Sequence, residues 1–416
     1  MLALALVAAG CSSSAGSDGA STSTAKARAT TTTSSQRPTG DPAAPEQFSG
    51  PLDDFYRVPD PLPKGEPGQL IRTMAIADAD PAEPGTTSLR VMYHSRDAND
   101  RDRAVTGVVT YPDAAAPKGG WPVITSAHGT TGIASPCAPS RWITSAPAFG
   151  VEGVRVATDY IGLGPVGELH PYLSGLDEGH SVLDIVRAAR HLPDAHAGTD
   201  YLIWGHSQGG HAALWAHQLS ASYAPELTLK GTAALAPAAE LTKTYGPIDE
   251  IVANVVSLMA LYGAQQEAPQ IDPDDYIGPQ VKAQESVVTT RCLDEITKVF
   301  SPIPRDEFYD ARPQDTEPMR SLIIANDPGK TKVDAPLLLV QGDQDIRVHP
   351  KRTADLFARL CRTGQATEYH LFPGTDHDSV IGASTATYEP WLQARLADKP
   401  PTDSCDDGTP VVHPAR

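Results

Sequence analysis

Short apolar runs and segments of helical spacing alternate along this chain, and this alternation limits its possible folds more than any other feature. The apolar runs each end in a loop and occupy residues 121–129, 154–160, 201–207, 229–237 and 335–343. Runs of this kind suit strands that are covered on both faces. Strand–helix alternation predicts an α/β fold built on a mostly parallel, doubly wound sheet.

Other segments extend this plan at both ends. Residues 89–95 and 104–112 alternate apolar and polar side chains and predict an antiparallel start, and residues 366–372 predict one more strand. The spacing of apolar residues predicts helices over 178–192, 209–220, 350–364 and 379–396. The segment 350–364 also begins with Pro and ends with Gly, as helices tend to.

The interval from Pro237 to Lys330 is far too long for an ordinary crossover. It contains helical stretches at 249–263 and 292–300, separated by Pro-rich joints. We expect a helical cap at about 238–330, inserted into a catalytic domain that spans 50–405 and is followed by a C-terminal tail at 406–416. Caps shape substrate access; a purely structural insert is the alternative.

The N-terminus predicts export. Residues 1–10 are apolar or small and end at Cys11, and ten residues are too few to cross a bilayer, which takes about 20. Small residues followed by Cys resemble the bacterial lipobox, although Ala8 stands where a branched residue is usual and no positive residue precedes the run. We expect a lipoprotein-type signal over 1–11 with lipidation at Cys11; a plain secretory signal is the alternative.

Residues 12–45 are rich in Ser, Thr, Ala and Gly and predict a disordered tether. No further apolar run approaches the length of about 18 residues that a membrane helix needs. We therefore expect an exported bacterial protein, either a cell-surface lipoprotein or a secreted one, that meets a membrane only through its lipid anchor.

The chain has five cysteines, so four remain when Cys11 is set aside. An even number in an exported chain favours disulfides, and four cysteines allow three pairings. We favour Cys137–Cys292 and Cys361–Cys405, because the second would pin the C-terminal tail to the body.

Charge and motifs exclude several function classes. The net charge of −18 argues against a nucleic-acid partner, which needs a basic face. No zinc-like Cys pairs, HExxH, P-loop or dinucleotide fingerprint occurs, and the intervals between His206, His211 and His217 miss the i, i+4 spacing of helical metal ligands. We expect no cofactor and no metal.

The segment Gly205–Gly209 reads G-x-S-x-G, with an apolar strand before it and a helix after it. This is the strand–turn–helix setting of a nucleophile elbow, in which glycines relieve crowding around a strained serine. The sequence therefore predicts Ser207 as a nucleophile. A serine that merely caps the helix is the alternative.

A serine nucleophile needs a base and an acid, which follow it in this fold in the order acid, then His. Asp343 and Asp345 both end an apolar strand, and we assign the acid to Asp345 because it lies further into the loop. The later histidines are His349, His370, His377 and His413. His377 is the predicted base, because it lies in a loop between a strand and a helix.

An oxyanion needs two N–H donors. One is expected from Gln208, directly after the nucleophile. The other is expected from the loop His128–Gly132, where we choose Thr130, with Thr131 close behind. An ordinary Gly-rich turn is the alternative for this loop.

These motifs together resemble the secretory lipase family of α/β-hydrolases, which includes the fungal lipase A type and exported actinobacterial members. The similarity runs from residue 55 to the last helix. It rests on CAPS (137–140), ATDYIGLG (157–164), HPYLSG (170–175), GHSQGG (205–210), GDQD (342–345) and GTDH (374–377). The chain departs from the fungal form at HGTTG, where an acidic residue can occur.

The resemblance implies hydrolysis of acyl esters, often triacylglycerols, under an α-helical cap. It places the triad on Ser207, Asp345 and His377 and suggests the same two disulfides. We therefore hypothesise a monomeric serine lipase or esterase whose partner is an acyl-ester or lipid substrate. The alternatives are an exported peptidase of the same fold and a catalytically silent surface binding protein.

Overall fold

The computed structural model describes residues 44–76, 83–244 and 251–415. The predicted signal segment, Cys11 and the tether up to residue 43 lie outside the described residues.

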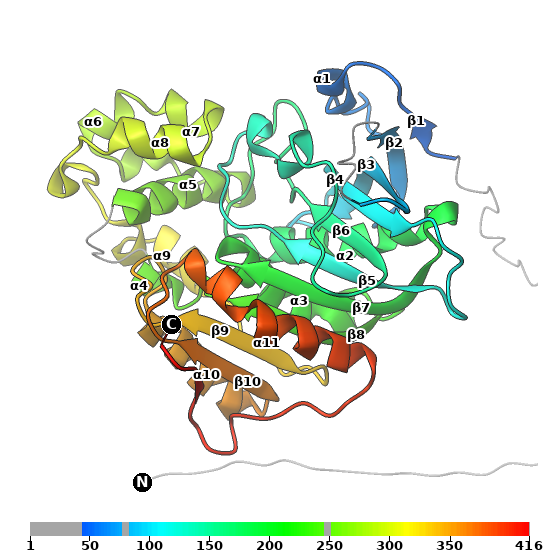
Figure 1. Ribbon diagram of the computed structural model, residues 1–416. Coiled ribbons are helices and arrows are strands. Elements are labelled where there is room, and N and C mark those ends of the chain that lie inside the picture. Colours follow the sequence, from blue (N-terminus) through cyan, green and yellow to red (C-terminus); the bar gives the residue numbers. More distant parts are fainter. Residues whose placement is uncertain (1–43, 77–82, 245–250, 416) are drawn as a thin grey trace, which may run out of the picture. The chain divides into compact units, whose positions relative to one another are not determined.

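Eleven strands of the described chain form one sheet, in the order β1-β2-β3-β4-β6-β5-β7-β8-β9-β10-β11 (Figure 1). The strands are β1 (Glu46–Gln47), β2 (Leu70–Ala75), β3 (Thr86–Arg96), β4 (Asp102–Pro112), β5 (Trp121–Ala127), β6 (Val154–Thr158), β7 (Ala197–His206), β8 (Thr228–Leu235), β9 (Leu337–Gly342), β10 (Thr367–Phe372) and β11 (Val411–Val412). The pairs β2–β3, β3–β4 and β4–β6 are antiparallel, and β6, β5, β7, β8, β9, β10 and β11 are parallel to one another. The predicted mostly parallel sheet with an antiparallel start is confirmed.

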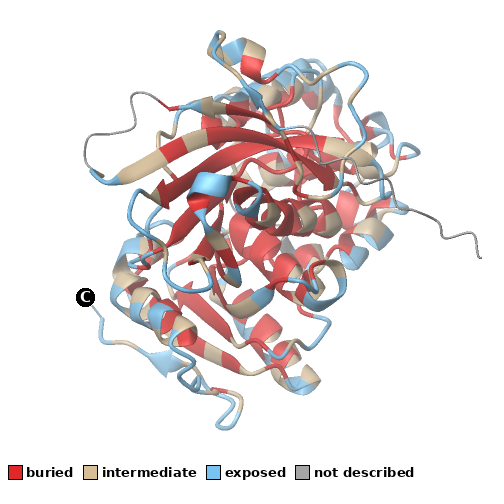
Figure 2. Cartoon of the chain, turned by 90° about the vertical axis from the view of Figure 1, so that its right-hand side faces the viewer, coloured by how far each residue is buried: buried red, intermediate tan, exposed pale blue. Residues whose placement is uncertain are grey.

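Helices cover both faces of this sheet (Figure 1). The helices that pack on or border the sheet are α1 (Leu52–Phe55), η1 (Ser135–Cys137), η2 (Pro139–Arg141), α2 (Gly175–Arg190), η3 (Pro193–Ala195), α3 (Gln208–Tyr223), α10 (Pro350–Thr363) and α11 (Ser379–Leu396). In β7, Tyr201 and Ile203 join the hydrophobic cluster of α2 and α3, whereas Leu202 and Trp204 join the cluster of α11. The period of two therefore buries both faces of the strand. Most of the sheet is accordingly coloured as buried in Figure 2.

The interval between β8 and β9 is helical. It contains α4 (Leu241–Thr244), α5 (Ile251–Glu267), η4 (Pro273–Asp275), α6 (Pro279–Lys282), α7 (Ser286–Thr290), α8 (Leu293–Phe300), η5 (Arg305–Glu307), η6 (Pro313–Asp315) and α9 (Met319–Ala325). The two predicted helices of this interval correspond to α5 and α8. Their apolar side chains form a hydrophobic cluster of their own, which also receives Ile133, Tyr172 and Leu173. We call residues 238–330 the cap.

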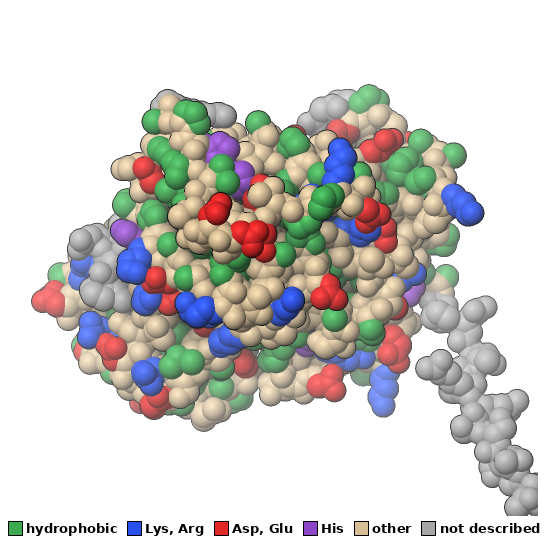
Figure 3. Space-filling model, turned by 90° about the horizontal axis from the view of Figure 1, so that it is seen from below, with side chains coloured by type: hydrophobic (Ala, Val, Ile, Leu, Met, Phe, Trp, Pro, Cys, Tyr) green, Lys and Arg blue, Asp and Glu red, His purple; other side chains and the backbone are tan. Residues whose placement is uncertain are grey.

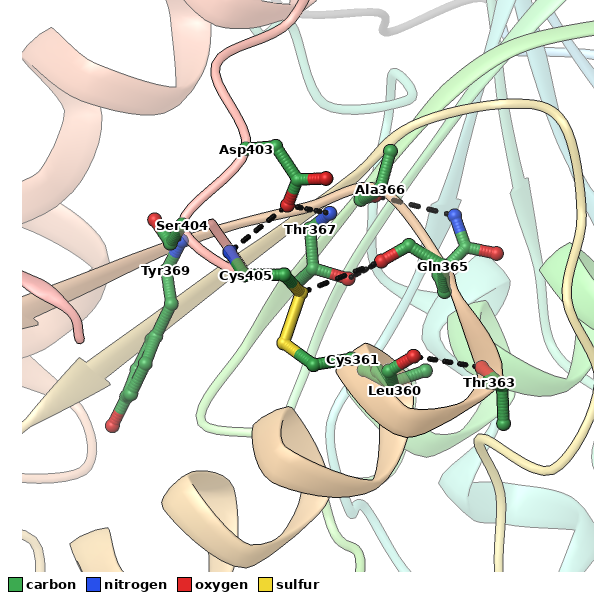
Figure 4. The surroundings of a disulfide bond; sticks show 10 residues. All are labelled: Leu360, Cys361, Thr363, Gln365, Ala366, Thr367, Tyr369, Asp403, Ser404 and Cys405. Atoms are coloured by element: carbon green, nitrogen blue, oxygen red, sulfur yellow. Dashed lines mark hydrogen bonds between the residues drawn. A yellow bond between two sulfur atoms is a disulfide. The ribbon is translucent and has the colours of Figure 1, made fainter. Parts of the chain in front are cut away.

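Both predicted disulfides are formed. Cys137–Cys292 joins the segment after β5 to the start of α8, and Cys361–Cys405 joins α10 to the C-terminal tail (Figure 4). The Asp403 carboxylate accepts hydrogen bonds from the Cys405 and Thr367 N–H groups at 3.0 and 3.2 Å (Figure 4). The tail then continues into β11, which pairs with β10 at the edge of the sheet.

Acidic and basic side chains are interspersed on the face shown in Figure 3. Elsewhere in the described chain, Arg187 pairs with Glu226 at 2.6 Å and Lys351 with Asp355 at 2.9 Å. Among the helices that the structure describes, none combines the length and apolar character needed to cross a bilayer.

Asp177, near the start of α2, has a buried carboxyl group. It accepts hydrogen bonds from the Ala98 N–H at 3.3 Å and from the Ser174 hydroxyl. Burial raises its pKa from 3.8 to about 7, and Glu267 and Asp97 add to this shift. The folded protein thus holds the proton more tightly than the unfolded chain, so stability falls as the pH rises from about 4 to about 7.

We expect Asp177→Asn to raise the urea midpoint of unfolding at pH 8 and to leave it near the wild-type value at pH 5. The oxygen of an asparagine can still accept the Ala98 N–H, and its NH2 group can donate to the Ser174 hydroxyl, without a buried charge. Asp306→Asn, at an exposed site, is the matched control and should change neither midpoint. An equal shift of the Asp177→Asn midpoint at the two pH values would contradict this account.

Candidate active site

Ser207 lies at the turn between β7 and α3, with φ 60° and ψ −118°. This left-handed backbone is uncommon for a residue other than glycine. A Cβ on Gly205 would overlap the Gly209 carbonyl oxygen, and a Cβ on Gly209 would overlap the Ala127 carbonyl oxygen. The two glycines of the motif are thus required by close backbone approach.

The structure brings Ser207, His377 and Asp345 into one chain of hydrogen bonds. The distance from Ser207 Oγ to His377 Nε2 is 2.8 Å, and that from His377 Nδ1 to Asp345 Oδ2 is 2.7 Å. Because the Asp345 carboxylate can only accept, His377 Nδ1 carries a proton and Nε2 is free to accept from the serine hydroxyl.

The Asp345 carboxylate is buried and fully hydrogen-bonded. Besides His377, it accepts from the Arg347 and Val348 N–H groups at 2.9 and 2.8 Å and from Gln341 Nε2 at 2.9 Å. These donors hold a charged carboxylate in a fixed orientation.

Asp343, the alternative acid, lies beside the triad without joining it. Its carboxylate accepts the Gly374 N–H at 2.7 Å and so fastens the loop that carries His377. The neighbouring Gln344 N–H donates to the Thr375 carbonyl at 2.9 Å, which joins the same two loops.

The expected oxyanion donors flank Ser207. Gln208 is the first residue of α3, so its N–H has no partner within the helix. Thr130 lines the same cavity as Ser207, and its hydroxyl is 2.6 Å from the Tyr172 hydroxyl. A Cβ on Gly129 would lie only 3.8 Å from Ser207 Cβ, so the loop before Thr130 runs directly beside the serine.

Two further histidines line this cavity. His206 Nε2 donates to the His377 carbonyl at 2.8 Å, and burial and the neighbouring His377 lower the pKa of His206 to about 4. Burial likewise lowers the pKa of His128 to about 4. Both rings are therefore neutral at pH 7, and His206 positions the backbone of the loop that carries His377.

Ser207 opens into a cavity of about 430 Å³ between the sheet edge and the cap. Its apolar walls come from Pro139 and Trp142 before β6, Val252, Ala253 and Val256 of α5, and Leu293 of α8. This size and lining suit an apolar group of a small molecule.

A set of buried polar side chains lies behind Ser207 that the sequence patterns do not predict, formed by His170, Glu178 and His211. His170 belongs to the HPYLSG motif, and the spacing of His211 argues only against a metal site. Within the described ranges, no group of three or more His, Cys, Asp or Glu side chains could hold a metal ion. His217 Nδ1 instead lies 3.0 Å from the Thr232 hydroxyl oxygen.

Known proteins are similar to this chain over most of its length. The chain is 24% identical over 392 residues to a probable inactive lipase of Mycobacterium tuberculosis, a match that covers 85% of this chain and 84% of the relative. It is 24% identical over 398 residues to the secreted triacylglycerol lipase LIP7 of Malassezia globosa, with 86% and 82% covered.

Among solved structures, Candida antarctica lipase A in its closed state superposes with a TM-score of 0.72 at 18% identity, covering 88% of this chain and 91% of that one. This likeness shows the α/β-hydrolase fold. The Secretory lipase family model matches residues 149–404, which is more than half of the chain. The chain therefore belongs to the secretory lipase family.

Proposed function

We propose that this chain is a serine carboxylic ester hydrolase that cleaves acyl esters through an acyl-enzyme. The observation that carries the proposal is the hydrogen-bonded series Ser207–His377–Asp345 at the floor of an apolar cavity. Family membership supports an ester hydrolase independently of this geometry.

In the proposed reaction, His377 Nε2 removes the proton from Ser207 as Oγ attacks the ester carbonyl carbon. Asp345 holds the imidazole in the required tautomer and stabilises its positive charge. When the tetrahedral intermediate collapses, the protonated His377 gives its proton to the leaving alcohol. A water then attacks the acyl-enzyme with His377 again as the base, which releases the acid and frees Ser207.

The negative charge of each tetrahedral intermediate would fall between the Gln208 and Thr130 N–H groups. The N-terminus of α3 adds a positive dipole end at this point. The Thr130 loop is fixed from the cap side, because the Leu293 N–H donates to the Thr131 carbonyl at 2.9 Å and Gly132 bridges to Cys292.

The cavity supports an acyl chain as the apolar part of the substrate. Its wall of aliphatic side chains on α5 contains no charged group, whereas Arg347 and Asp378 lie on the side of the catalytic histidine. Acyl-ester lipids, including triacylglycerols, satisfy this arrangement. Export, with a lipid anchor at Cys11, is part of the proposal and agrees with a secretory family and two disulfides.

Ser207→Ala tests the nucleophile. We expect hydrolysis of p-nitrophenyl esters from acetate to palmitate to fall at least about 10⁴-fold, because the covalent step is lost. Wild-type turnover of aminoacyl anilides in preference to esters would favour a peptidase. Well-folded wild-type protein no more active than Ser207→Ala would contradict the proposal and agree with a silent protein, as the name of the mycobacterial relative describes.

Val256→Trp tests whether α5 lines the acyl site. A larger side chain in the cavity should lower kcat/KM for palmitate about 10-fold or more relative to acetate, since burial of each methylene contributes about 0.8 kcal/mol. Gln265→Trp, on the same helix but outside the cavity lining, should keep the wild-type ratio. An unchanged palmitate-to-acetate ratio in Val256→Trp would contradict this placement.

Replacing both Cys137 and Cys292 by Ser should loosen the hold of the cap on the His128–Gly132 loop, because the disulfide fixes Cys292, whose backbone bridges to Gly132. We expect kcat to fall about 10-fold, less than the loss of a whole oxyanion donor, because the Thr130 N–H is then held less firmly. The matched variant with both Cys361 and Cys405 replaced by Ser should lose thermal stability but keep its kcat. Equal kcat losses in the two double variants would contradict a specific role for the first disulfide.

A further inference from the structure

A buried polar cluster lies behind the elbow, outside the lining of the cavity. We call it the elbow cluster; its members are His170, Glu178, Gln208, His211 and Asn326. The His170, Glu178 and His211 side chains are fully buried, and Gln208 and Asn326 are exposed by only 1% and 8%. Most buried polar groups are hydrogen-bonded, and each member of the elbow cluster makes at least one such bond, although Gln208 Oε1 has no partner within the described part of the chain.

Gln208 connects the elbow cluster to the reaction site. Its N–H is an expected oxyanion donor, while its side-chain Nε2 lies 2.8 Å from His170 Nε2 and 2.8 Å from Glu178 Oε1. His170 Nδ1 donates to the Ile161 carbonyl at 2.8 Å, so His170 Nε2 has a free lone pair and accepts one amide hydrogen. The other amide hydrogen goes to Glu178.

Glu178 is also connected to Thr130, the second expected oxyanion donor, through Leu173 and Tyr172. Its Oε1 accepts the Leu173 N–H at 3.1 Å, at a residue with φ 62°. The adjoining Tyr172 hydroxyl is the group that bonds the Thr130 hydroxyl. The Glu178 carboxylate is therefore connected to both expected donors. The Gln208 side chain provides one connection, and Leu173 and Tyr172 provide the other, to Thr130.

His211 joins Glu178 to the cap. Its Nδ1 lies 2.6 Å from Glu178 Oε2, and its Nε2 lies 2.9 Å from the Asn326 carbonyl oxygen, just after α9. The carboxylate and the carbonyl oxygen are both acceptors, so the His211 ring bridges Glu178 of α2 to the residue that follows α9. Burial favours the neutral acid, but the electrostatic attraction and the hydrogen bond of His211 outweigh it and lower the pKa of Glu178 to about 2.

Asn326 makes the connection to the cap specific. Its carbonyl also accepts Trp215 Nε1 at 2.9 Å, and its Oδ1 accepts the Gly175 N–H at 2.7 Å, at the start of α2. The cap is thus bound to α2 and α3 by the same atoms that hold the Glu178–His211 pair. A buried ion pair gives little net stability compared with apolar residues, so orientation is the better account of its presence.

We propose that Glu178, paired with His211, is a positioning residue that holds both oxyanion donors in place and links the cap to them. This inference rests on the proposed ester hydrolysis. Glu178 touches neither the substrate cavity nor the reacting atoms; it acts through Gln208 and through the Leu173–Tyr172–Thr130 connection.

Glu178→Ala removes every acceptor of this carboxylate, and Glu178→Gln keeps one for Gln208 and Leu173. We expect kcat on p-nitrophenyl butyrate to fall about 10- to 100-fold in Glu178→Ala, with KM within about twofold and partial recovery in Glu178→Gln, because losing a whole oxyanion donor costs about 100- to 1,000-fold. The affinity for butylboronic acid, whose serine adduct is tetrahedral, should fall by the same factor as kcat.

His217→Gln is the matched control, because it replaces another buried imidazole of α3 that lies outside the elbow cluster. It should lower the melting temperature without changing kcat or boronic acid affinity. If Glu178→Ala and Glu178→Gln fold and keep the wild-type kcat and boronic acid affinity, the proposal is overturned. Losses that are no larger than those of His217→Gln overturn it as well.

If Glu178→Ala does not fold, Glu178→Gln and Gln208→Ala give the test. Gln208→Ala keeps the backbone N–H but removes its side-chain anchor, so it should also lower kcat with little change in KM. In the double variant with Glu178→Gln, the two losses should be less than multiplicative, since the Gln208 N–H is a donor on which both substitutions act. Fully multiplicative losses would overturn action through Gln208.

The rate at which an alkyl fluorophosphonate labels Ser207 separates this proposal from the proposed function. Rapid wild-type labelling without ester turnover would contradict ester hydrolysis alone. Equal labelling rates in wild type and Glu178→Gln would contradict the positioning role alone. A wild-type protein that neither labels nor hydrolyses esters would contradict both.

Discussion

The left-handed backbone of Ser207 is the constraint on which the site depends. A conformation of this kind costs about 1–3 kcal/mol at a residue with a side chain. It persists because Gly205 and Gly209 remove the clashes, and because the Ser207 N–H donates to the Leu235 carbonyl while the Ser207 carbonyl accepts from the Ala238 N–H. As a result, the Ser207 hydroxyl lies at the carboxyl edge of the sheet, next to the Gln208 N–H at the start of α3.

The remaining groups reach this serine because parallel strands bring their carboxyl ends to one edge. The loops after β5, β9 and β10 supply the Thr130, Asp345 and His377 groups, and hydrogen bonds between loops fix their relative positions. The cap contributes from the opposite side, where Cys292 bridges to Gly132 at the end of the His128–Gly132 loop and the Asn326 carbonyl accepts from His211 of α3. The cap therefore both lines the cavity at Ser207 and helps to hold the polar groups around it.

The sequence pattern predicted those strands and helices whose formation depends on the spacing of apolar residues along the chain. The long apolar strands, α2, α3, α10 and α11 follow from periodicity. Chain order and strand ends point to Ser207, Asp345 and His377, which the structure joins by hydrogen bonds. The sequence patterns did not predict the short elements. The strand β11 has two residues and depends on the tail that Cys405 anchors, and α6 and α7 depend on the hydrophobic cluster of the cap, to which they contribute Val281 and Val288. Glu178 was not predicted either, because its partners Leu173, Gln208 and His211 meet only through the packing of α2 on α3.

The central claim is that Ser207 carries an acyl group during ester hydrolysis. Rapid acid quenching of wild-type protein with excess p-nitrophenyl butyrate, followed by peptide mass spectrometry, tests it most directly. The account predicts a butyryl adduct on Ser207 that forms within one turnover and is absent from Ser207→Ala. Ester turnover without any adduct on Ser207, or with the acyl group on another residue, would contradict it.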